Sequence, residues 1–179
     1  LTLKSGNPLT APVNVVVVGL TSDNEVSIYA DSIPKAAATK IVATLVAVGA
    51  TGKKDEVTRI PAGSLATADV IVAIGLGSEK TGFTPEQLRR AAGSATRTLA
   101  GFKKVAIAIT AVDAIQFGAI LEGAAFGAYS FTAHLNATLK KAKSPVASVA
   151  LFTSDSITAE YRHAHLRAQV LAQGVSFAR

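Results

Sequence analysis

The sequence has 179 residues, of which 49% are hydrophobic and 6% aromatic, and it contains no cysteine. This length suits a single domain, residues 1–179, whose core consists mainly of Ala, Val, Ile and Leu. The lack of cysteine excludes disulfides and thiolate metal sites and agrees with a cytoplasmic location. No apolar run reaches the roughly 18 residues of a membrane span, so we expect no membrane partner.

Eighteen Lys and Arg against twelve Asp and Glu give a formal net charge of +6. This excess permits binding to polyanions such as nucleic acids but does not demonstrate it. The alternative is that the charge serves solubility, and the sequence leaves both open.

The first half of the chain alternates between strand and helix patterns. Residues 13–18 are mostly β-branched and predict a strand that is buried on both faces, and residues 57–60 predict a short strand. A helix is expected between them, with Ser32 as its capping residue, Pro34 in its first turn and Gly49 at its end. Its inward residues recur at spacings of three and four: Ile33, Ala37, Ile41, Leu45 and Val48.

Residues 70–74 predict the second buried strand, which glycines close. The next helix has a clear start, because Thr84 is a capping residue, Pro85 takes the first helical position and Gln87 takes the capping-box position. Its predicted apolar stripe comprises Leu88, Ala91, Ala92, Ala95 and Leu99.

Residues 105–109 predict the third buried strand, and Asp113 with Gln116 starts another helix. Gly123 and Gly127 lie within that helix, where each costs about 1 kcal/mol relative to Ala. We therefore expect each glycine to permit a close approach by a neighbouring backbone. The inner residues are expected to be Ile120, Leu121, Ala124, Ala125 and Ala128.

Residues 146–152 predict a fourth buried strand, and residues 156–177 predict a long final helix. Its expected inward residues are Ile157, Tyr161, Ala164, Ala168, Leu171 and Val175. Because strands alternate with helices, the predicted fold class is α/β, with a mostly parallel sheet and helices on both faces.

The residue types that usually carry catalysis or bind metals form no recognisable motif. His163 and His165 lie about 200° apart around a helix and cannot share an ion, and His134 is distant in sequence. The run from Gly75 to Gly77 begins like a dinucleotide-binding loop, but its third glycine position is lysine and its helix starts late. No catalytic, cofactor-binding or metal-binding residue is therefore predicted.

Basic residues provide the one candidate binding surface. Weak polyanion binding is assigned to Arg89, Arg90, Arg97, Lys103 and Lys104. Further basic residues follow at positions 140, 141 and 143, but few aromatic residues accompany them, so we expect no base-stacking platform.

Two segments resemble the amino-terminal domain of the leucyl aminopeptidase (cytosol aminopeptidase) family. The first runs from Ala-Asp-Val-Ile-Val-Ala-Ile-Gly-Leu-Gly at residues 68–77 through Thr-Pro-Glu-Gln-Leu-Arg-Arg-Ala-Ala-Gly at residues 84–93. The second is Glu-Gly-Ala-Ala-Phe-Gly-Ala-Tyr-Ser-Phe at residues 122–131. The final helix is similar to the family's connecting helix, with Arg179 as the first residue of the segment that leads into the catalytic domain.

This resemblance implies a macrodomain-like α/β domain of a hexameric aminopeptidase that removes amino-terminal residues from peptides. The family uses two divalent metals (zinc, manganese or magnesium) in a carboxy-terminal domain that has no counterpart here. No functional residue carries over, and the chain alone is expected to be inactive. The implied partners are the missing catalytic domain and other subunits, and some bacterial members bind DNA through this domain.

Three functions remain open from sequence. The first is a non-catalytic domain that supports assembly and active-site access. The second is a nucleic-acid-binding module, which basic residues clustered on one face would favour. The third is a macrodomain-like binder of a small ligand, which an open cleft at residues 75–83 would favour.

Overall fold

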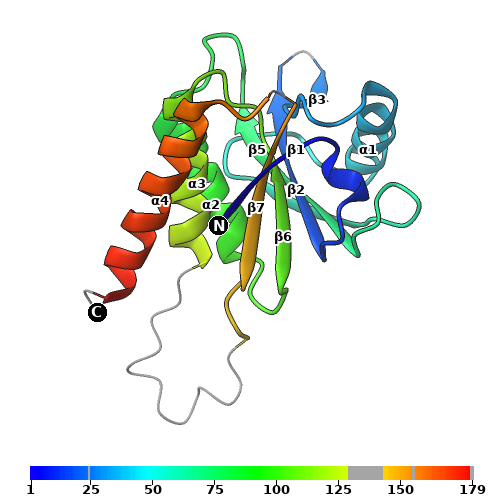
Figure 1. The fold of residues 1–179 in the computed structure, drawn as a ribbon. Helices are drawn as coiled ribbons and strands as arrows, with labels where there is room; N and C mark the ends of the chain where they lie inside the picture. Colours follow the sequence, from blue (N-terminus) through cyan, green and yellow to red (C-terminus); the bar gives the residue numbers. More distant parts are fainter. Residues whose placement is uncertain (24, 129–142, 155, 178–179) are drawn as a thin grey trace.

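The computed structural model describes residues 1–23, 25–128, 143–154 and 156–177 (Figure 1). In chain order its elements are β1 (Thr2–Ser5), the 3-10 helix η1 (Pro8–Thr10), β2 (Val15–Ser22), β3 (Val26–Ile28), α1 (Lys35–Ala47), β4 (Val57–Pro61), β5 (Val70–Gly77), α2 (Pro85–Arg97), β6 (Lys104–Ala108), α3 (Ala114–Ala128), β7 (Ser148–Thr153) and α4 (Ala159–Phe177).

All described strands belong to one sheet, in the order β1-β7-β6-β2-β5-β4, with β3 paired to β2. The pairs β1·β7, β7·β6, β6·β2 and β2·β5 are parallel, whereas β3 and β4 run antiparallel to their neighbours. The four predicted buried strands therefore lie together in one mostly parallel sheet, and the predicted α/β fold class is confirmed.

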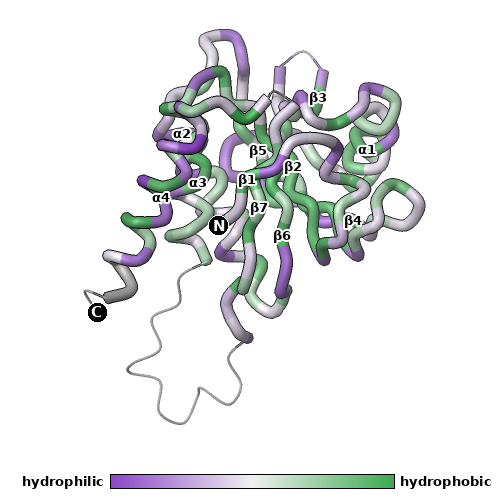
Figure 2. Tube along the Cα trace, in the orientation of Figure 1, coloured by the Kyte–Doolittle hydropathy of each residue, from purple (hydrophilic) through white to green (hydrophobic). Residues whose placement is uncertain are grey.

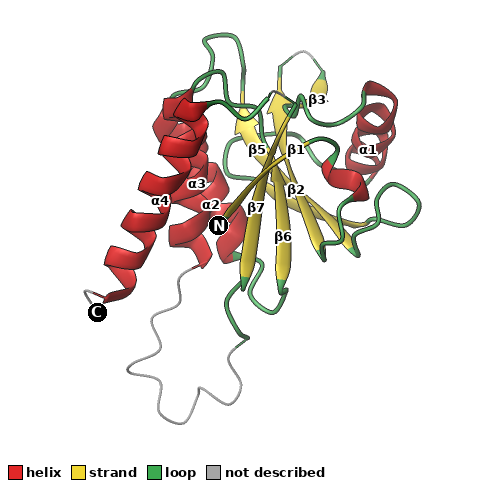
Figure 3. Cartoon of the chain, viewed as in Figure 1, coloured by secondary structure: helices red, strands yellow, loops and turns green. Residues whose placement is uncertain are grey.

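Helices cover both faces of this sheet: α2, α3 and α4 lie on one side and α1 with η1 on the other (Figure 3). Alternate residues of β2 enter different cores, because successive strand side chains point to opposite faces. Val15 and Val17 pack in the core under α2–α4, while Val16 and Val18 pack in the core under α1. The central strands are accordingly the most hydrophobic part of the trace (Figure 2).

The predicted helix starts of α2 and α3 are confirmed by their hydrogen bonds. Thr84 Oγ1 accepts from the backbone N–H of Gln87 at 3.3 Å, and Gln87 Oε1 accepts from the backbone N–H of Thr84 at 2.8 Å. Asp113 Oδ1 accepts from the backbone N–H of Gln116 at 2.7 Å. These caps satisfy donors that have no partner within the helix.

The glycines of α3 do permit the close backbone approach that was predicted. A Cβ on Gly123 would lie 2.0 Å from the carbonyl oxygen of Arg89 in α2, and a Cβ on Gly127 would lie 2.3 Å from that of Gly93. Only glycine fits at these two positions, so α2 and α3 pack backbone against backbone.

Several predictions at element ends were wrong. Ser32 does not cap α1: Pro34 takes the cap position without a side-chain hydrogen bond, and the Ser32 hydroxyl is buried without a partner in the described part of the chain. Val48 and Leu171 were both predicted to point inward, but they are 58% and 40% exposed, and Val48 lies just after the last residue of α1. The final helix begins at Ala159 instead of residue 156.

Two strands, β1 and β3, were not predicted, because both are short and carry exposed polar residues. Some predicted features lie outside the described residues. They are the end of the second family-like segment (residues 129–131), His134, Lys140, Lys141 and Arg179.

Candidate functional site

Open α/β sheets usually bind ligands where neighbouring strands diverge at their carboxyl ends. Here residues 15–18 of β2 pair with β6, whereas residues 20–22 of β2 pair with β3. Strands β2 and β6 therefore diverge after residue 18, and the crevice between them lies beside β2. The rings of Tyr29 and Phe83 meet there edge to face, with their centroids 4.9 Å apart. The backbone of Tyr29 links β2 to the segment that follows β6. Its N–H donates to the carbonyl of Gly19 in β2, and its carbonyl accepts from the N–H of Thr110.

The described crevice is therefore occupied by the protein's own side chains. Phe83 is 5% exposed, and Gln116 Nε2 donates to its carbonyl at 2.7 Å. Burial raises the pKa of Tyr29, and the charges of Glu79 and Asp31 add to this.

The glycine loop after β5 has a structural explanation. A Cβ on Gly75 would lie 1.8 Å from the carbonyl oxygen of Lys53, and Gly77 has a φ of 87°. The N–H of Gly77 donates to the carbonyl of Gly52, so the loop packs directly against residues 52–56. The glycines serve this backbone contact, which needs no bound phosphate.

The opposing segment, residues 52–56, holds one strongly bonded carboxylate. Glu56 accepts hydrogen bonds from the hydroxyl and backbone N–H of Thr51, at 2.7 and 3.1 Å, and from the N–H of Lys53 at 3.1 Å. The Thr51 hydroxyl is the main cause that lowers the pKa of Glu56, partly offset by burial. This carboxylate organises the turn between α1 and β4.

The five predicted polyanion-binding residues fall into two groups. Arg89 and Arg90 already have carboxylate partners: Arg89 pairs with Glu86 and Glu122, and Arg90 pairs with Asp55 at 2.9 Å.

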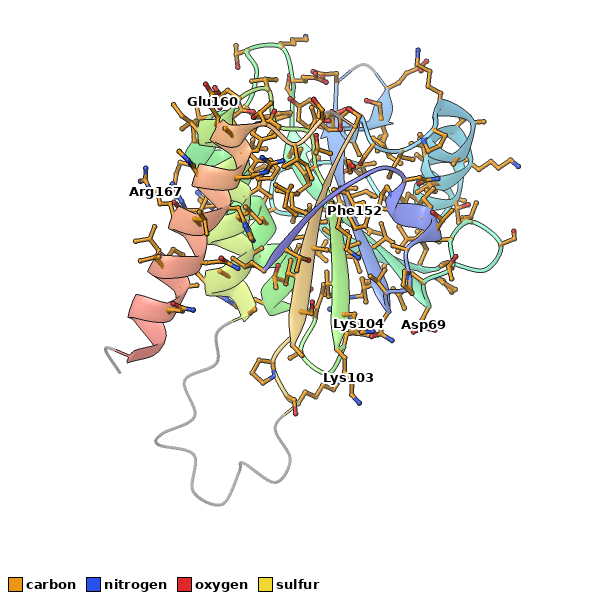
Figure 4. The ribbon with its side chains drawn as sticks, in the orientation of Figure 1. Asp69, Lys103, Lys104, Phe152, Glu160 and Arg167 are labelled. Carbon is orange, nitrogen blue, oxygen red and sulfur yellow. The ribbon has the colours of Figure 1, made fainter. Side chains whose placement is uncertain are left out.

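The remaining three, Arg97, Lys103 and Lys104, have no carboxylate within ion-pair distance among the described residues. Arg97 lines a pocket together with Lys143. Figure 4 shows Lys103 and Lys104 at the lower end of β6, far from the labelled residues of α4.

A pocket that was not predicted lies between α3 and α4. It has a volume of about 340 Å³, and its polar lining comes from Arg89, Glu122, Glu160, His163 and Arg167. Glu122 is the only charged residue of α3 and is 8% exposed. A lone acid in an otherwise apolar helix is the sequence signal that could have indicated this site, because a buried charge needs a partner.

The described residues contain no group of three or more His, Cys, Asp or Glu that could hold a metal ion. None of the helices in the described part combines the length and the apolar run needed to cross a bilayer.

Comparison with known proteins identifies the domain. Residues 17–138 match the family model described as the cytosol aminopeptidase family, N-terminal domain. The chain is 40% identical over 177 residues to a protein of Rhodococcus opacus (strain B4) named "Probable cytosol aminopeptidase", covering 93% of this chain and 33% of that protein. This chain belongs to the cytosol aminopeptidase family, as an N-terminal domain.

Another relative supports this assignment. A protein of Streptomyces coelicolor with the same name is 40% identical over 167 residues, which cover 84% of this domain and 32% of that protein. The chain thus spans about a third of the length of the curated relatives it matches.

Solved structures show the same fold. A tomato leucine aminopeptidase mutant covers 98% of the domain with a TM-score of 0.71 and 13% identity, and the domain spans 36% of that chain. The bottromycin maturation enzyme BotP covers 90% of the domain with a TM-score of 0.63 and 20% identity, and the domain spans 30% of that chain.

Proposed function

We propose that this domain serves assembly and active-site access in a cytoplasmic, metal-dependent leucyl aminopeptidase that removes amino-terminal residues from peptides. One observation carries the proposal: 93% of the chain matches a third of a cytosol aminopeptidase relative at 40% identity. The remaining two thirds of such a protein would carry the chemistry.

The chemistry of the described residues agrees with a non-catalytic role. Hydrolysis by two metal ions requires several carboxylates around the ions, and no such group exists in the described part of the chain. The zinc, manganese or magnesium of the family therefore does not fit the residues described here, and we derive no catalytic step from them.

The outer surface of α4 supports a role in assembly. Leu166 is 56% exposed and Val170 is 66% exposed, and residues four apart lie on the same side of a helix. Exposed apolar patches usually mark contacts with other proteins or domains. In the proposed enzyme, a hexamer, this surface would contact the catalytic domain or a neighbouring subunit.

The test compares this chain with a longer protein, in which the domain is followed by the part that makes up the other two thirds of its relatives. We expect the longer protein to hydrolyse leucine-p-nitroanilide with manganese, zinc or magnesium, and the 179-residue chain to show no turnover. Turnover that copurifies with the 179-residue chain through several columns would contradict the non-catalytic role. A longer protein that is inactive with every metal would contradict the aminopeptidase assignment.

A second candidate function, weak polyanion binding, is favoured by Arg97, Lys103 and Lys104, which have no carboxylate partner among the residues that the structure describes. We propose only sequence-indifferent DNA binding with a steep salt dependence, because phosphate neutralisation by lysine and arginine releases counterions. We expect little binding at about 150 mM salt, where non-specific dissociation constants are about 1–100 µM or weaker.

The test is a salt titration of DNA binding with charge-reversal variants. Arg97→Glu combined with Lys104→Glu should abolish the low-salt binding, whereas Lys35→Glu combined with Lys40→Glu, two exposed positions in α1 with the same change of net charge, should reduce it slightly. Equal losses in the two variants would show that net charge alone is responsible. Affinity tighter than about 1 µM at 150 mM salt would show that DNA binding is a main function of the domain.

A further inference from the structure

The groove between α3 and α4 has the size and the lining of a small-molecule site. Its volume of about 340 Å³ lies within the range of ligand pockets. Ala114, Gly118, Ala119 and Ala164 form an apolar floor of small residues, and Ile115 at the rim is 71% exposed.

The glycine in this floor differs from those that bring α2 and α3 together. A Cβ on Gly118 would lie 3.5 Å from the Cβ of Ala164, which is an ordinary contact distance. Packing of α3 against α4 therefore does not require glycine here, whereas packing against α2 requires it at Gly123. The absent side chain of Gly118 instead enlarges the groove.

Glu122 supplies a largely buried carboxylate to the lining of the groove. Its Oε2 accepts from Nε of Arg89 at 3.1 Å. Its Oε1 lies 3.8 Å from Nε of Arg167, beyond hydrogen-bonding distance, and receives no hydrogen bond from the described residues. This oxygen is not one of the fully buried atoms that lack a partner, and Glu122 lines the groove, so Oε1 can accept a hydrogen bond from a bound ligand.

The rim of the groove supplies charges of both signs. Glu160 contributes a second carboxylate, and both it and Arg167 lie on α4 (Figure 4). The side chain of Arg167 is 78% exposed, which leaves most of its N–H donors free for an anionic group.

We propose that this groove binds a free α-amino acid with an apolar side chain. The ammonium group donates to Glu122 Oε1 and Glu160, the carboxylate accepts from Arg167, and the side chain lies on the floor between Ile115 and Ala164. A phosphate would face two carboxylates, and a wholly apolar ligand would leave the charges desolvated. A further consequence rests on the proposed function: such amino acids are products of an aminopeptidase, so the groove would sense product.

The test is a ¹⁵N NMR titration of the 179-residue chain with L-leucine. We expect saturable shifts of amide signals from α3 and α4, centred on Gly118 and Ala164, with a dissociation constant of about 1 mM or tighter. N-acetyl-leucine, which lacks the ammonium group, and isoamylamine, which lacks the carboxylate, should each bind about tenfold more weakly, because each loses one charge-assisted contact. This test does not depend on peptidase activity, so it can fail while the proposed function holds.

Two variants and one matched control locate the site. Arg167→Ala should weaken leucine binding by about tenfold, and Glu122→Gln, which keeps the shape of the side chain, should abolish saturation. Arg162→Ala, on the exposed side of the same helix and outside the groove, should leave the affinity unchanged. If Glu122→Gln does not fold, Arg167→Ala remains informative, because its side chain is largely exposed.

Three outcomes would overturn the proposal. The first is an absence of saturable shifts at about 10 mM leucine, which is tenfold above the expected dissociation constant. The second is equal affinity for leucine and N-acetyl-leucine. The third is an equal loss of leucine affinity in Arg167→Ala and Arg162→Ala.

Discussion

Substitution of Gly123 by alanine tests the backbone contact between α2 and α3. The added Cβ would lie 2.0 Å from the carbonyl oxygen, 2.8 Å from the carbonyl carbon and 2.9 Å from the Cα of Arg89. All three are backbone atoms, so no side chain can move aside. The two helices would have to separate by roughly 1.5 Å to bring the 2.0 Å contact to a distance near 3.5 Å.

The expected cost follows from two opposing effects. Overpacking of a tight core costs about 1–3 kcal/mol, and this site belongs at the upper end because the backbone must shift. Replacing a helical glycine by alanine returns about 1 kcal/mol. We therefore expect the free energy of unfolding to fall by about 2 kcal/mol, which lowers Tm by about 4–8 °C in a domain of this size.

The assay is thermal and urea unfolding followed by circular dichroism, with Gly174→Ala as the matched control. Gly174 also lies in a helix, but a Cβ there meets no atom within 4 Å, so the same substitution should stabilise slightly. If Gly123→Ala is as stable as the unsubstituted chain, or if both variants shift in the same direction, the close packing of α2 on α3 is refuted.

Two further predictions concern local hydrogen bonds. Thr84→Ala removes the capping box of α2 and should cost about 1 kcal/mol, whereas Thr39→Ala in the exposed interior of α1 should be neutral or slightly stabilising; equal losses of Tm in the two variants would contradict the role of the cap. Glu56 has a pKa below the ordinary value of 4.5, so its stabilisation is complete above that pH and is lost as the pH falls toward its lowered pKa. Glu56→Gln should therefore reduce the decline of stability in acid, as measured by urea unfolding from pH 7 to pH 3, and an unchanged pH profile would disprove this.

Local sequence signals predicted most of the central fold. The β-branched run at residues 13–18 predicts a strand and the Thr84–Gln87 pair predicts a helix start, because the causes of both structures lie within a few residues. Strands β1 and β3 could not be predicted in this way, because their polar residues become strands only through pairing with β7 and β2.

The candidate sites depend on contacts between distant elements. The sequence indicates that Arg89 and Arg90 are basic, but not that Asp55 and Glu122 lie close enough to pair with them. The groove between α3 and α4 was missed for the same reason, since Glu122 and Arg167 are 45 positions apart and meet only when the helices pack. The lone acid in an apolar helix was the one local sign of it.

The paired rings of Tyr29 and Phe83 also affect how the stability of the domain responds to its surroundings. A crevice that is closed by a ligand gains stability by mass action, so its resistance to unfolding rises and falls with the concentration of that ligand. Here the groups that close the crevice are part of the polypeptide, so the closure adds no dependence on the concentration of a ligand. The contribution of these two rings to stability is therefore present as soon as the chain has folded.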